Sequence, residues 1–223
     1  LKVRKELTTM GINSDPQDSH TAQAYGEVAS KYDSFYGDER CMAEDAKVMK
    51  LLRDQFGTPL DGHLLDIGCG TGLLLDNMGQ MIAPDSYLGV DISQQMTTEA
   101  KRKHPDYSFV TQNILHWKGQ RFKYAVALYG VCSYIPLDRA FEVLTSHLTI
   151  GGKFFLMLYS GGHTSRILPD SIANNITYPT TLEDINYATF RYRDWFTDVE
   201  VFPFSGTGEL MIVRGERINH HLF

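Results

Sequence analysis

Apolar residues recur along this chain in two patterns, short continuous runs typical of buried strands and helical spacing typical of amphipathic helices. The apolar runs predict strands at residues 63–67, 87–91, 107–112, 124–129 and 152–159. The helical spacing predicts helices at about 21–36, 42–56, 73–80, 94–103 and 138–148. Strands that alternate with helices form right-handed βαβ units. The pattern therefore predicts an α/β fold with a doubly wound, mostly parallel sheet and helices on both faces.

The pattern changes after the last of these strands. Residues 160–180 carry early glycines and little periodicity, and we expect them to form a lid insertion. The string Thr-Thr-Leu-Glu at 180–183 predicts a capping box that opens a helix running to about Trp195. Two further apolar runs at 198–204 and 210–215, joined by serine, glycine and threonine, predict a terminal hairpin.

Composition sets the domain count and excludes some classes of protein. A chain of 223 residues with 43% hydrophobic residues fits one globular domain, and we place it at 19–223 after a flexible N-terminal arm at 1–18. No apolar stretch reaches the length of a membrane span, and no signal peptide is visible. Three scattered cysteines suit neither a disulfide framework nor a zinc site, which predicts a reduced, cytoplasmic protein. The net charge of −6 argues against a nucleic-acid partner.

The chemistry begins where the first predicted strand ends, in the string Asp-Ile-Gly-Cys-Gly-Thr-Gly-Leu-Leu at 66–74. Three glycines spaced two apart let the chain turn sharply and present backbone N–H groups to a ligand at a helix N-terminus. The second strand ends in Asp91, whose carboxylate is placed to hold the two hydroxyls of a ribose. A nucleoside-containing cofactor across the carboxyl ends of these strands explains both features.

The glycine spacing is G-x-G-x-G rather than the G-x-G-x-x-G of dinucleotide sites, and Leu73 stands where the third glycine of that fingerprint would be. The string resembles motif I of the class I S-adenosylmethionine-dependent methyltransferases. The segments at 87–93, 109–114 and 122–131, and the turn at 148–153, resemble further motifs of that family in the same order. The resemblance extends over about residues 25–215.

The resemblance implies a seven-stranded sheet whose last strand is antiparallel, with an N-terminal helical lid. It also implies S-adenosylmethionine as cofactor and S-adenosylhomocysteine as product. The cofactor-binding residues it implies are Tyr25, Tyr32, Asp66, Gly68, Cys69, Gly70, Gly72, Asp91, Ile92, Met96, Asn113, Ile114 and Tyr129. By analogy, the glycine loop takes the amino acid end of the cofactor through backbone contacts.

The adenosine end is expected at the second and third motifs. Asp91 would accept from the ribose, and Ile92 and Met96 would flank the adenine, with ordinary helix packing as the other use of Met96. Many relatives carry Asp where Asn113 stands. The Asn113 oxygen can accept the same hydrogen bond from the adenine amine without charge, and the Ile114 N–H can supply a second contact.

At the methionine end the resemblance leaves two uses open for each residue. Tyr25 and Tyr32 lie where relatives place an aromatic lid, or they pack against the sheet edge. Asp66 either supports the glycine loop, or reaches the cofactor's amino group through water. Alternatively, it only hydrogen-bonds the turn. Tyr129 follows the fourth strand and is expected beside the cofactor.

Candidates for catalysis lie after the fourth and fifth strands. Tyr134 either orients the acceptor or belongs to the core, and relatives often carry histidine where Ser133 stands. His163 follows a glycine pair in the expected lid, and it is either a general base or a surface histidine. No cluster of acidic, histidine or cysteine residues has metal-ligand spacing, so we expect no metal.

The sequence therefore predicts an enzyme of the EC 2.1.1 class that moves a methyl group to N or O of a small-molecule acceptor. Transfer from a sulfonium needs collinear positioning in a dry pocket more than it needs a nucleophilic side chain. Two alternatives stay open: methylation of a protein or other macromolecule, and binding of S-adenosylmethionine without methyl transfer. We expect a monomer or homodimer, with neither a nucleic-acid nor a membrane partner.

Overall fold

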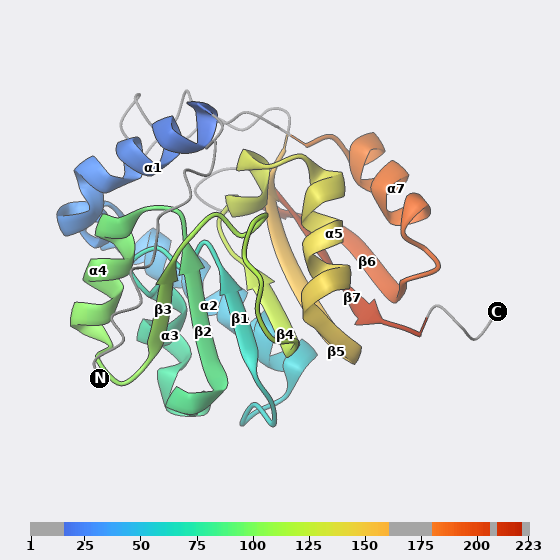
Figure 1. Cartoon of the computed structure of the whole chain (residues 1–223), viewed down its shortest axis with the longest axis horizontal. Helices are drawn as coiled ribbons and strands as arrows, with labels where there is room; N and C mark the ends of the chain where they lie inside the picture. Colours follow the sequence, from blue (N-terminus) through green and yellow to red (C-terminus); the bar gives the residue numbers. More distant parts are fainter. Residues whose placement is uncertain (1–15, 161–179, 206–208, 220–223) are drawn as a thin grey trace, which may run out of the picture.

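The computed structural model describes residues 16–160, 180–205 and 209–219, and the strands in these ranges form one seven-stranded sheet in the order β3-β2-β1-β4-β5-β7-β6 (Figure 1). The strands are β1 (Leu64–Ile67), β2 (Tyr87–Asp91), β3 (Ser108–Thr111), β4 (Phe122–Ala127), β5 (Leu148–Tyr159), β6 (Phe196–Ser205) and β7 (Glu209–Arg217). The first five strands pair in parallel, and β7 is antiparallel to both β5 and β6. This is the sheet that the sequence predicted.

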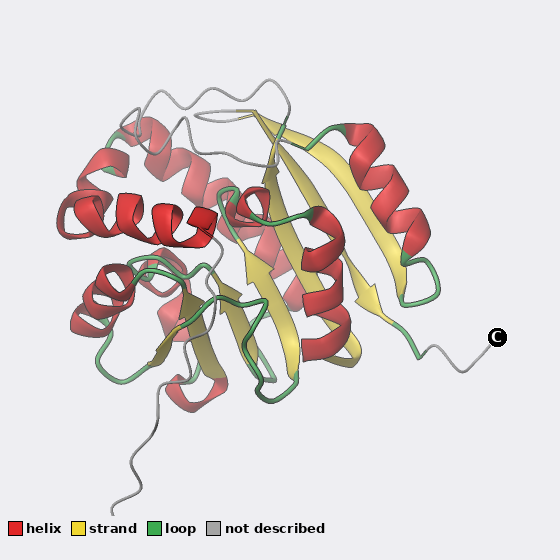
Figure 2. Ribbon diagram, turned by 45° about the horizontal axis from the view of Figure 1, so that its top comes forward, coloured by secondary structure: helices red, strands yellow, loops and turns green. Residues whose placement is uncertain are grey.

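The α-helices of the described ranges are α1 (Pro16–Val28), α2 (Glu39–Phe56), α3 (Leu73–Met78), α4 (Gln94–Lys103), α5 (Leu137–His147) and α7 (Leu182–Arg191). Short 3₁₀ segments are η1 (Ala29–Tyr36), η2 (Gly79–Met81), η3 (Pro84–Ser86) and η4 (Val131–Tyr134). Figure 2 shows helices on both sides of the twisted sheet. None of these helices is long and apolar enough to cross a bilayer.

Two hydrophobic clusters fill the space between the sheet and its helices. Successive side chains of a strand point to opposite faces, so each buried strand supplies both clusters. Along β5, Phe154, Leu156 and Leu158 pack with α5 and α7, whereas Phe155, Met157 and Tyr159 pack with α2 and α3. This double burial explains why the central strands appear in the sequence as continuous apolar runs.

The order of the strands places a crevice at β1. From β1 the chain moves outward through β2 to β3, then returns to the other side of β1 with β4 and continues to β5. In open parallel sheets, ligands bind outside the carboxyl ends of the strands where the strand order reverses in this way. The glycine loop follows β1 directly, so it lies at this crevice.

The N-terminal helices cover that end of the sheet. Figure 1 shows α1 above the arrowheads of β2 and β3. A third cluster made of Ala24, Val28, Ala29 and Met96 attaches α1 and η1 to α4. The predicted helix at 21–36 is thus two elements, and it begins at Pro16, because proline suits the first turn of a helix. Of the predicted arm at 1–18, residues 16–18 belong to α1 and the rest lie outside the described residues.

Two helix starts differ from the sequence prediction because of local capping. Helix α2 begins three residues earlier than predicted, since the Asp38 carboxylate accepts from the Cys41 N–H at 2.7 Å. The capping box of α7 lies one residue later than predicted and joins Thr181 to Asp184, not Thr180 to Glu183. The N–H of Thr180 instead donates to the carbonyl of Tyr159 at 3.0 Å. The interior of the expected lid, 161–179, lies outside the described residues.

Candidate functional site

The loop after β1 needs glycine at three positions for different reasons. Gly68, Gly70 and Gly72 have φ of +66°, +53° and +93°, a region that other residues rarely adopt. A Cβ on Gly68 would come within 2.4 Å of the Val131 side chain, whereas a Cβ on Gly70 would meet no protein atom within 4 Å. Gly70 therefore faces open space where a ligand can approach the backbone, and Gly72 forms the N-cap of α3.

Asp91 joins the glycine loop to the end of β2. Its Oδ2 accepts from the N–H of Gly70 at 3.0 Å, and its Oδ1 accepts from the N–H of Ser93 at 2.8 Å. Burial raises the pKa of this carboxyl, and the two N–H donors oppose that shift. Each oxygen keeps a second lone pair. The residue predicted to hold a ribose thus also fixes the loop that would lie beside it.

Asp66 is buried under the same loop, with 3% of its surface exposed. It accepts from the Tyr87 hydroxyl at 2.8 Å, a partner that the sequence analysis did not include. Burial raises the pKa of Asp66 to about 7, the charge of Asp91 adds to the rise, and the Tyr87 hydrogen bond opposes it. A carboxyl in this state responds strongly to a positive charge brought near it.

One cavity gathers most of the predicted site residues. Its wall includes Tyr25, Tyr32, Asp66, Gly68, Cys69, Gly70, Asp91, Ile92, Met96, Asn113, Ile114, Tyr129 and Tyr134. Gly72 is not part of this wall. Burial raises the pKa of the Cys69 thiol well above its ordinary value, so the thiol stays protonated and is unsuited to act as a nucleophile. His163 lies outside the described residues.

On the cavity wall, Asn113 is held by two hydrogen bonds. Its Oδ1 accepts from the N–H of Leu115 at 2.8 Å, and its Nδ2 donates to Oδ2 of Asp18 at 2.6 Å. Asp18 belongs to the first turn of α1 and also lines the cavity. The oxygen that the sequence analysis assigned to the adenine amine therefore already has a backbone partner.

Three tyrosines, Tyr25, Tyr32 and Tyr134, line the same cavity as the glycine loop. The hydroxyls of Tyr25 and Tyr134 share a hydrogen bond at 2.9 Å, and the rings of Tyr25 and Tyr32 lie 6.0 Å apart. Burial raises the pKa of all three phenols. The phenols are therefore neutral at physiological pH, and Tyr134 can orient a substrate as a hydrogen-bonding group but is unsuited to act as a base. Ser133 is fully buried, and its hydroxyl accepts from the N–H of Tyr159 at 2.8 Å.

A second cavity adjoins the first and is strongly acidic. Tyr32, Leu73 and Tyr129 line both cavities. The second is also lined by Asp33, Tyr36, Cys41, Glu44, Asp45 and Asp76. The Tyr129 hydroxyl donates to the Asp45 carboxylate, whose pKa is raised by burial and by the charges of Glu44 and Asp76. Four carboxyl groups and three phenol rings suit a positively charged or amine group.

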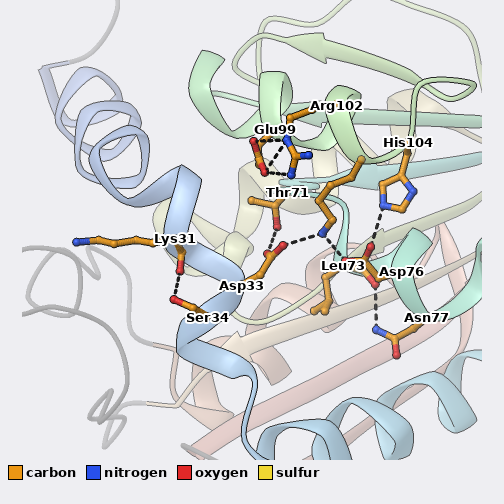
Figure 3. A network of polar contacts seen from close by, with 11 residues as sticks. Lys31, Asp33, Ser34, Thr71, Leu73, Asp76, Asn77, Glu99, Arg102 and His104 are labelled. Atoms are coloured by element: carbon orange, nitrogen blue, oxygen red, sulfur yellow. Dashed lines mark hydrogen bonds and ion pairs between the residues drawn. The ribbon is translucent and has the colours of Figure 1, made fainter.

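A polar network fastens η1 to the glycine loop (Figure 3). The Thr71 hydroxyl donates to Asp33, which also pairs with the Lys103 ammonium at 2.8 Å. Lys103 contacts Asp76 on α3 at 2.5 Å, and His104 contacts the other oxygen of Asp76 at 3.0 Å. The N-terminal elements are thus attached to the loop by hydrogen bonds as well as by apolar contacts.

Several wall residues were not predicted from the sequence. They are Asp18, Thr21, Ile67, Thr71, Leu73, Leu74, Val90, Gln112, Leu128, Val131 and Ile135. Thr71, Leu73 and Leu74 stood within the glycine motif, so that motif could have indicated them. Asp18 and Thr21 had no such signal, because helix α1 brings them to the site through tertiary packing. In the described ranges, no group of three or more His, Cys, Asp or Glu residues is arranged to hold a metal ion.

The comparisons with known proteins indicate a methyltransferase domain in this chain. Residues 65–154 match a family model described as a methyltransferase domain. A dTDP-3-amino-3,4,6-trideoxy-alpha-D-glucopyranose N,N-dimethyltransferase of Streptomyces venezuelae is 28% identical over 131 residues, which are 56% of this chain and 54% of the relative. A trans-aconitate 2-methyltransferase of Afipia carboxidovorans is 26% identical over 113 residues, 49% of this chain and 40% of the relative. The chain spans about half or less of the length of these curated relatives.

The whole fold also has a solved counterpart. The magnesium protoporphyrin IX methyltransferase (ChlM) from Synechocystis PCC 6803, crystallised with bound S-adenosylmethionine, superposes with a TM-score of 0.66 at 18% identity. The superposition covers 92% of this chain and 99% of the solved chain. The sheet order and this superposition show that the chain has the Rossmann-like fold of the class I S-adenosylmethionine-dependent methyltransferases, and residues 65–154 match a methyltransferase domain.

Proposed function

We propose that this chain binds S-adenosylmethionine in the cavity at the carboxyl ends of β1, β2 and β4 and transfers its methyl group to a small-molecule acceptor. The observation that carries the proposal is the pairing of Asp91 with Gly70 beside the open space over Gly70. A carboxylate for a ribose and an unobstructed backbone for an amino acid group lie side by side there. The same arrangement suits the product, S-adenosylhomocysteine.

The rest of the wall fits the other parts of that cofactor. Ile92 and Ile114 line the same cavity as Asn113, and a flat apolar adenine would lie against them. Asp66, with its raised pKa, lies under the loop where the cofactor's amino group is expected. The cofactor, when bound, supplies a methyl group on a sulfonium, and the neutral thioether that remains after transfer is a good leaving group. The chain's own residues then have to exclude water and align the acceptor.

Tyr25 and Tyr134 are the groups best placed for alignment, because their hydroxyls meet at the cavity wall after β4. We expect Tyr134→Phe to slow turnover about tenfold, the effect of losing one hydrogen bond to the acceptor. The affinity for S-adenosylhomocysteine should stay unchanged. Steady-state kinetics together with calorimetry measure both quantities. A loss of affinity for S-adenosylhomocysteine as large as the loss of rate would show that Tyr134 contacts the cofactor instead. An unaltered rate would show that Tyr134 only packs in the core.

The acceptor is the finer part of the proposal, and the acidic second cavity favours an amine. Lys103 already compensates part of the charge of Asp33 and Asp76. Asp45, with the Glu44 carboxyl beside it in the same cavity, would attract a protonated or partly protonated amine and repel an anion such as trans-aconitate. The name of the Streptomyces venezuelae relative includes an amino sugar and N-methylation, which agrees with this chemistry. His163 stays a candidate general base of the proposal, and it becomes useful where an ammonium must lose a proton before attack.

Mass spectrometry of the purified protein, intact and denatured, tests the cofactor directly. We expect co-purified S-adenosylhomocysteine or S-adenosylmethionine, or else binding of both by calorimetry. A panel of small amines, alcohols and carboxylic acids, with formation of S-adenosylhomocysteine as readout, then tests the transfer. Failure to bind either compound contradicts the proposal. Binding without turnover on the panel, or turnover only on a protein, favours the non-methylating or the macromolecular alternative.

Gly70, with Gly57 as its matched control, tests whether the ligand approaches the backbone of the glycine loop. Both have positive φ, and a Cβ on either would meet no protein atom within 4 Å. Gly57 follows α2 and is not part of the cavity wall. We expect Gly70→Ala to weaken S-adenosylhomocysteine binding at least tenfold, because the methyl group would occupy the space of the ligand. Gly57→Ala should lower the melting temperature without altering affinity. Equal affinities for the two variants would show that the ligand does not approach Gly70.

A further inference from the structure

The adenine end of the cavity carries a carboxylate that comes from α1 and not from the third motif. Asp18 is half-buried, lines the cavity together with Asn113 and Ile114, and lies 2.6 Å from the Asn113 side chain.

The hydrogen bonds fix the orientation of the Asn113 amide. The N–H of Leu115 can only donate, so the group facing it must be the Asn113 oxygen. The amide NH₂ of Asn113 then faces Asp18, which agrees with a carboxylate that can only accept. The Asn113 oxygen is therefore held by its own loop and keeps one lone pair without charge, and the NH₂ is held by Asp18.

Asp18 keeps acceptor capacity after this contact. A carboxylate has two oxygens with about four lone-pair directions, and Asn113 occupies one of them. Among the described wall residues, the other carboxyl groups are Asp66 and Asp91, which are joined to Tyr87 and to the loop around Gly70. At the Asn113 end, Asp18 is thus the carboxylate available to a ligand.

Adenine presents an amine donor next to a ring nitrogen acceptor. We propose that Asp18 accepts from the exocyclic amine of the adenine and that Asn113 is a positioning residue that holds the Asp18 carboxylate in place. The inference rests on the proposed binding of the cofactor, and it names the residue that selects adenine over other bases. The charge that many relatives carry on the third motif is supplied here by the N-terminal helix, so adenine recognition requires α1 to be docked.

A pair of ligands that differ only at this edge tests the proposal. S-inosylhomocysteine carries a carbonyl oxygen where S-adenosylhomocysteine carries the amine. A carboxylate accepts from the amine and repels the carbonyl oxygen. We expect the wild-type chain to prefer S-adenosylhomocysteine by about 100-fold in calorimetry, since a hydrogen bond to a charged group is lost and a polar group is left without a partner.

The variants should change this ratio and not only the affinities. In Asp18→Ala we expect the preference to fall to a few-fold. In Asp18→Asn the new amide has its oxygen toward the Asn113 NH₂ and its own NH₂ toward the ligand, so the preference should vanish or reverse. Asn113→Ala should reduce the ratio less than Asp18→Ala, because the carboxylate remains but is no longer held. Glu27→Gln is the control, since Glu27 lies on the same helix outside the cavity wall and accepts from the Gln23 side chain.

The outcomes separate this inference from the proposed function. A wild-type preference that survives in Asp18→Ala and disappears in Asn113→Ala would overturn the assignment to Asp18. Asn113 would then be the residue that accepts from the adenine amine. An equal loss of both affinities at constant ratio would reduce Asp18 to a structural contact and also overturn it. If the wild-type chain binds neither ligand, the proposed function itself fails. Melting curves of each variant show whether the domain remains folded, and hydrogen exchange of the α1 amides shows whether the helix stays docked.

Discussion

Replacing Asp91 by alanine is expected to lower the affinity for S-adenosylhomocysteine by about 3 kcal/mol, or somewhat more than 100-fold. Two effects add. The ribose loses a charged acceptor, and the N–H groups of Gly70 and Ser93 lose the oxygens to which they donate at 3.0 and 2.8 Å. Because the loop is fixed through Asp91, part of the loss comes from a less ordered binding site. Isothermal titration calorimetry measures the change.

A second ligand separates the two effects. The 2′-deoxy analogue of S-adenosylhomocysteine lacks one ribose hydroxyl, so it should bind the wild-type chain more weakly than the parent compound. Asp91→Ala should no longer distinguish the two ligands if the carboxylate contacts that hydroxyl. Asp85→Ala is the control, because Asp85 is exposed in η3 before the start of β2. Unaltered affinity in a folded Asp91→Ala variant would contradict the ribose assignment.

The parts of the fold that could be predicted from the sequence are those set by local signals. The bounds of β2 and α4 agree with the prediction, because an apolar run ends at Asp91 and the Ser93 side chain caps the helix that follows. The parallel sheet follows from βαβ alternation, and its seven strands with an antiparallel last strand follow from the family resemblance, whereas the strand order itself was not predicted. The glycine spacing located the loop, since few other sequences permit three positive φ angles so close together.

The parts that were not predicted depend on tertiary contacts. Asp18 reaches Asn113 only because α1 packs on α4, and no periodicity in the sequence relates residues so far apart. The partner of Asp66 was missed for a similar reason. Tyr87 lies on the neighbouring strand, and its hydroxyl would come within 2.9 Å of a Cβ built on Gly89. The glycine in β2 thus allows the contact, which a linear motif does not show.

Asp66 should make the stability of the protein depend on pH. In the folded chain its pKa is raised to about 7, mainly by burial, whereas an unfolded aspartate titrates near 3.9. Between these values the folded chain holds a proton that the unfolded chain has released. The free energy of unfolding therefore decreases as pH rises through this window, and the full cost is present above the folded pKa. Each pKa unit corresponds to about 1.4 kcal/mol.

Asp66→Asn removes this dependence while keeping an oxygen for the Tyr87 hydroxyl. We expect the variant to gain about 2 to 3 kcal/mol of stability relative to the wild-type chain between pH 5 and pH 8. Urea unfolding of both chains across that range measures the difference. Asp54→Asn is the control, because Asp54 is an exposed residue of α2 paired with Lys50, and its effect should be nearly constant over this range. A stability difference for Asp66→Asn that does not vary with pH would contradict the raised pKa.

The same carboxyl then links stability to ligand binding. The amino group and the sulfonium of S-adenosylmethionine are positive, and a positive charge near Asp66 favours its ionised form. Binding should therefore release a proton, and the affinity of the wild-type chain should rise between pH 6 and pH 8. Asp66→Asn should show a weaker rise and a lower affinity at pH 8. A buried carboxyl that costs stability in the free protein thus contributes affinity only when a cation is bound, which gives a physical reason for an acidic residue under the loop.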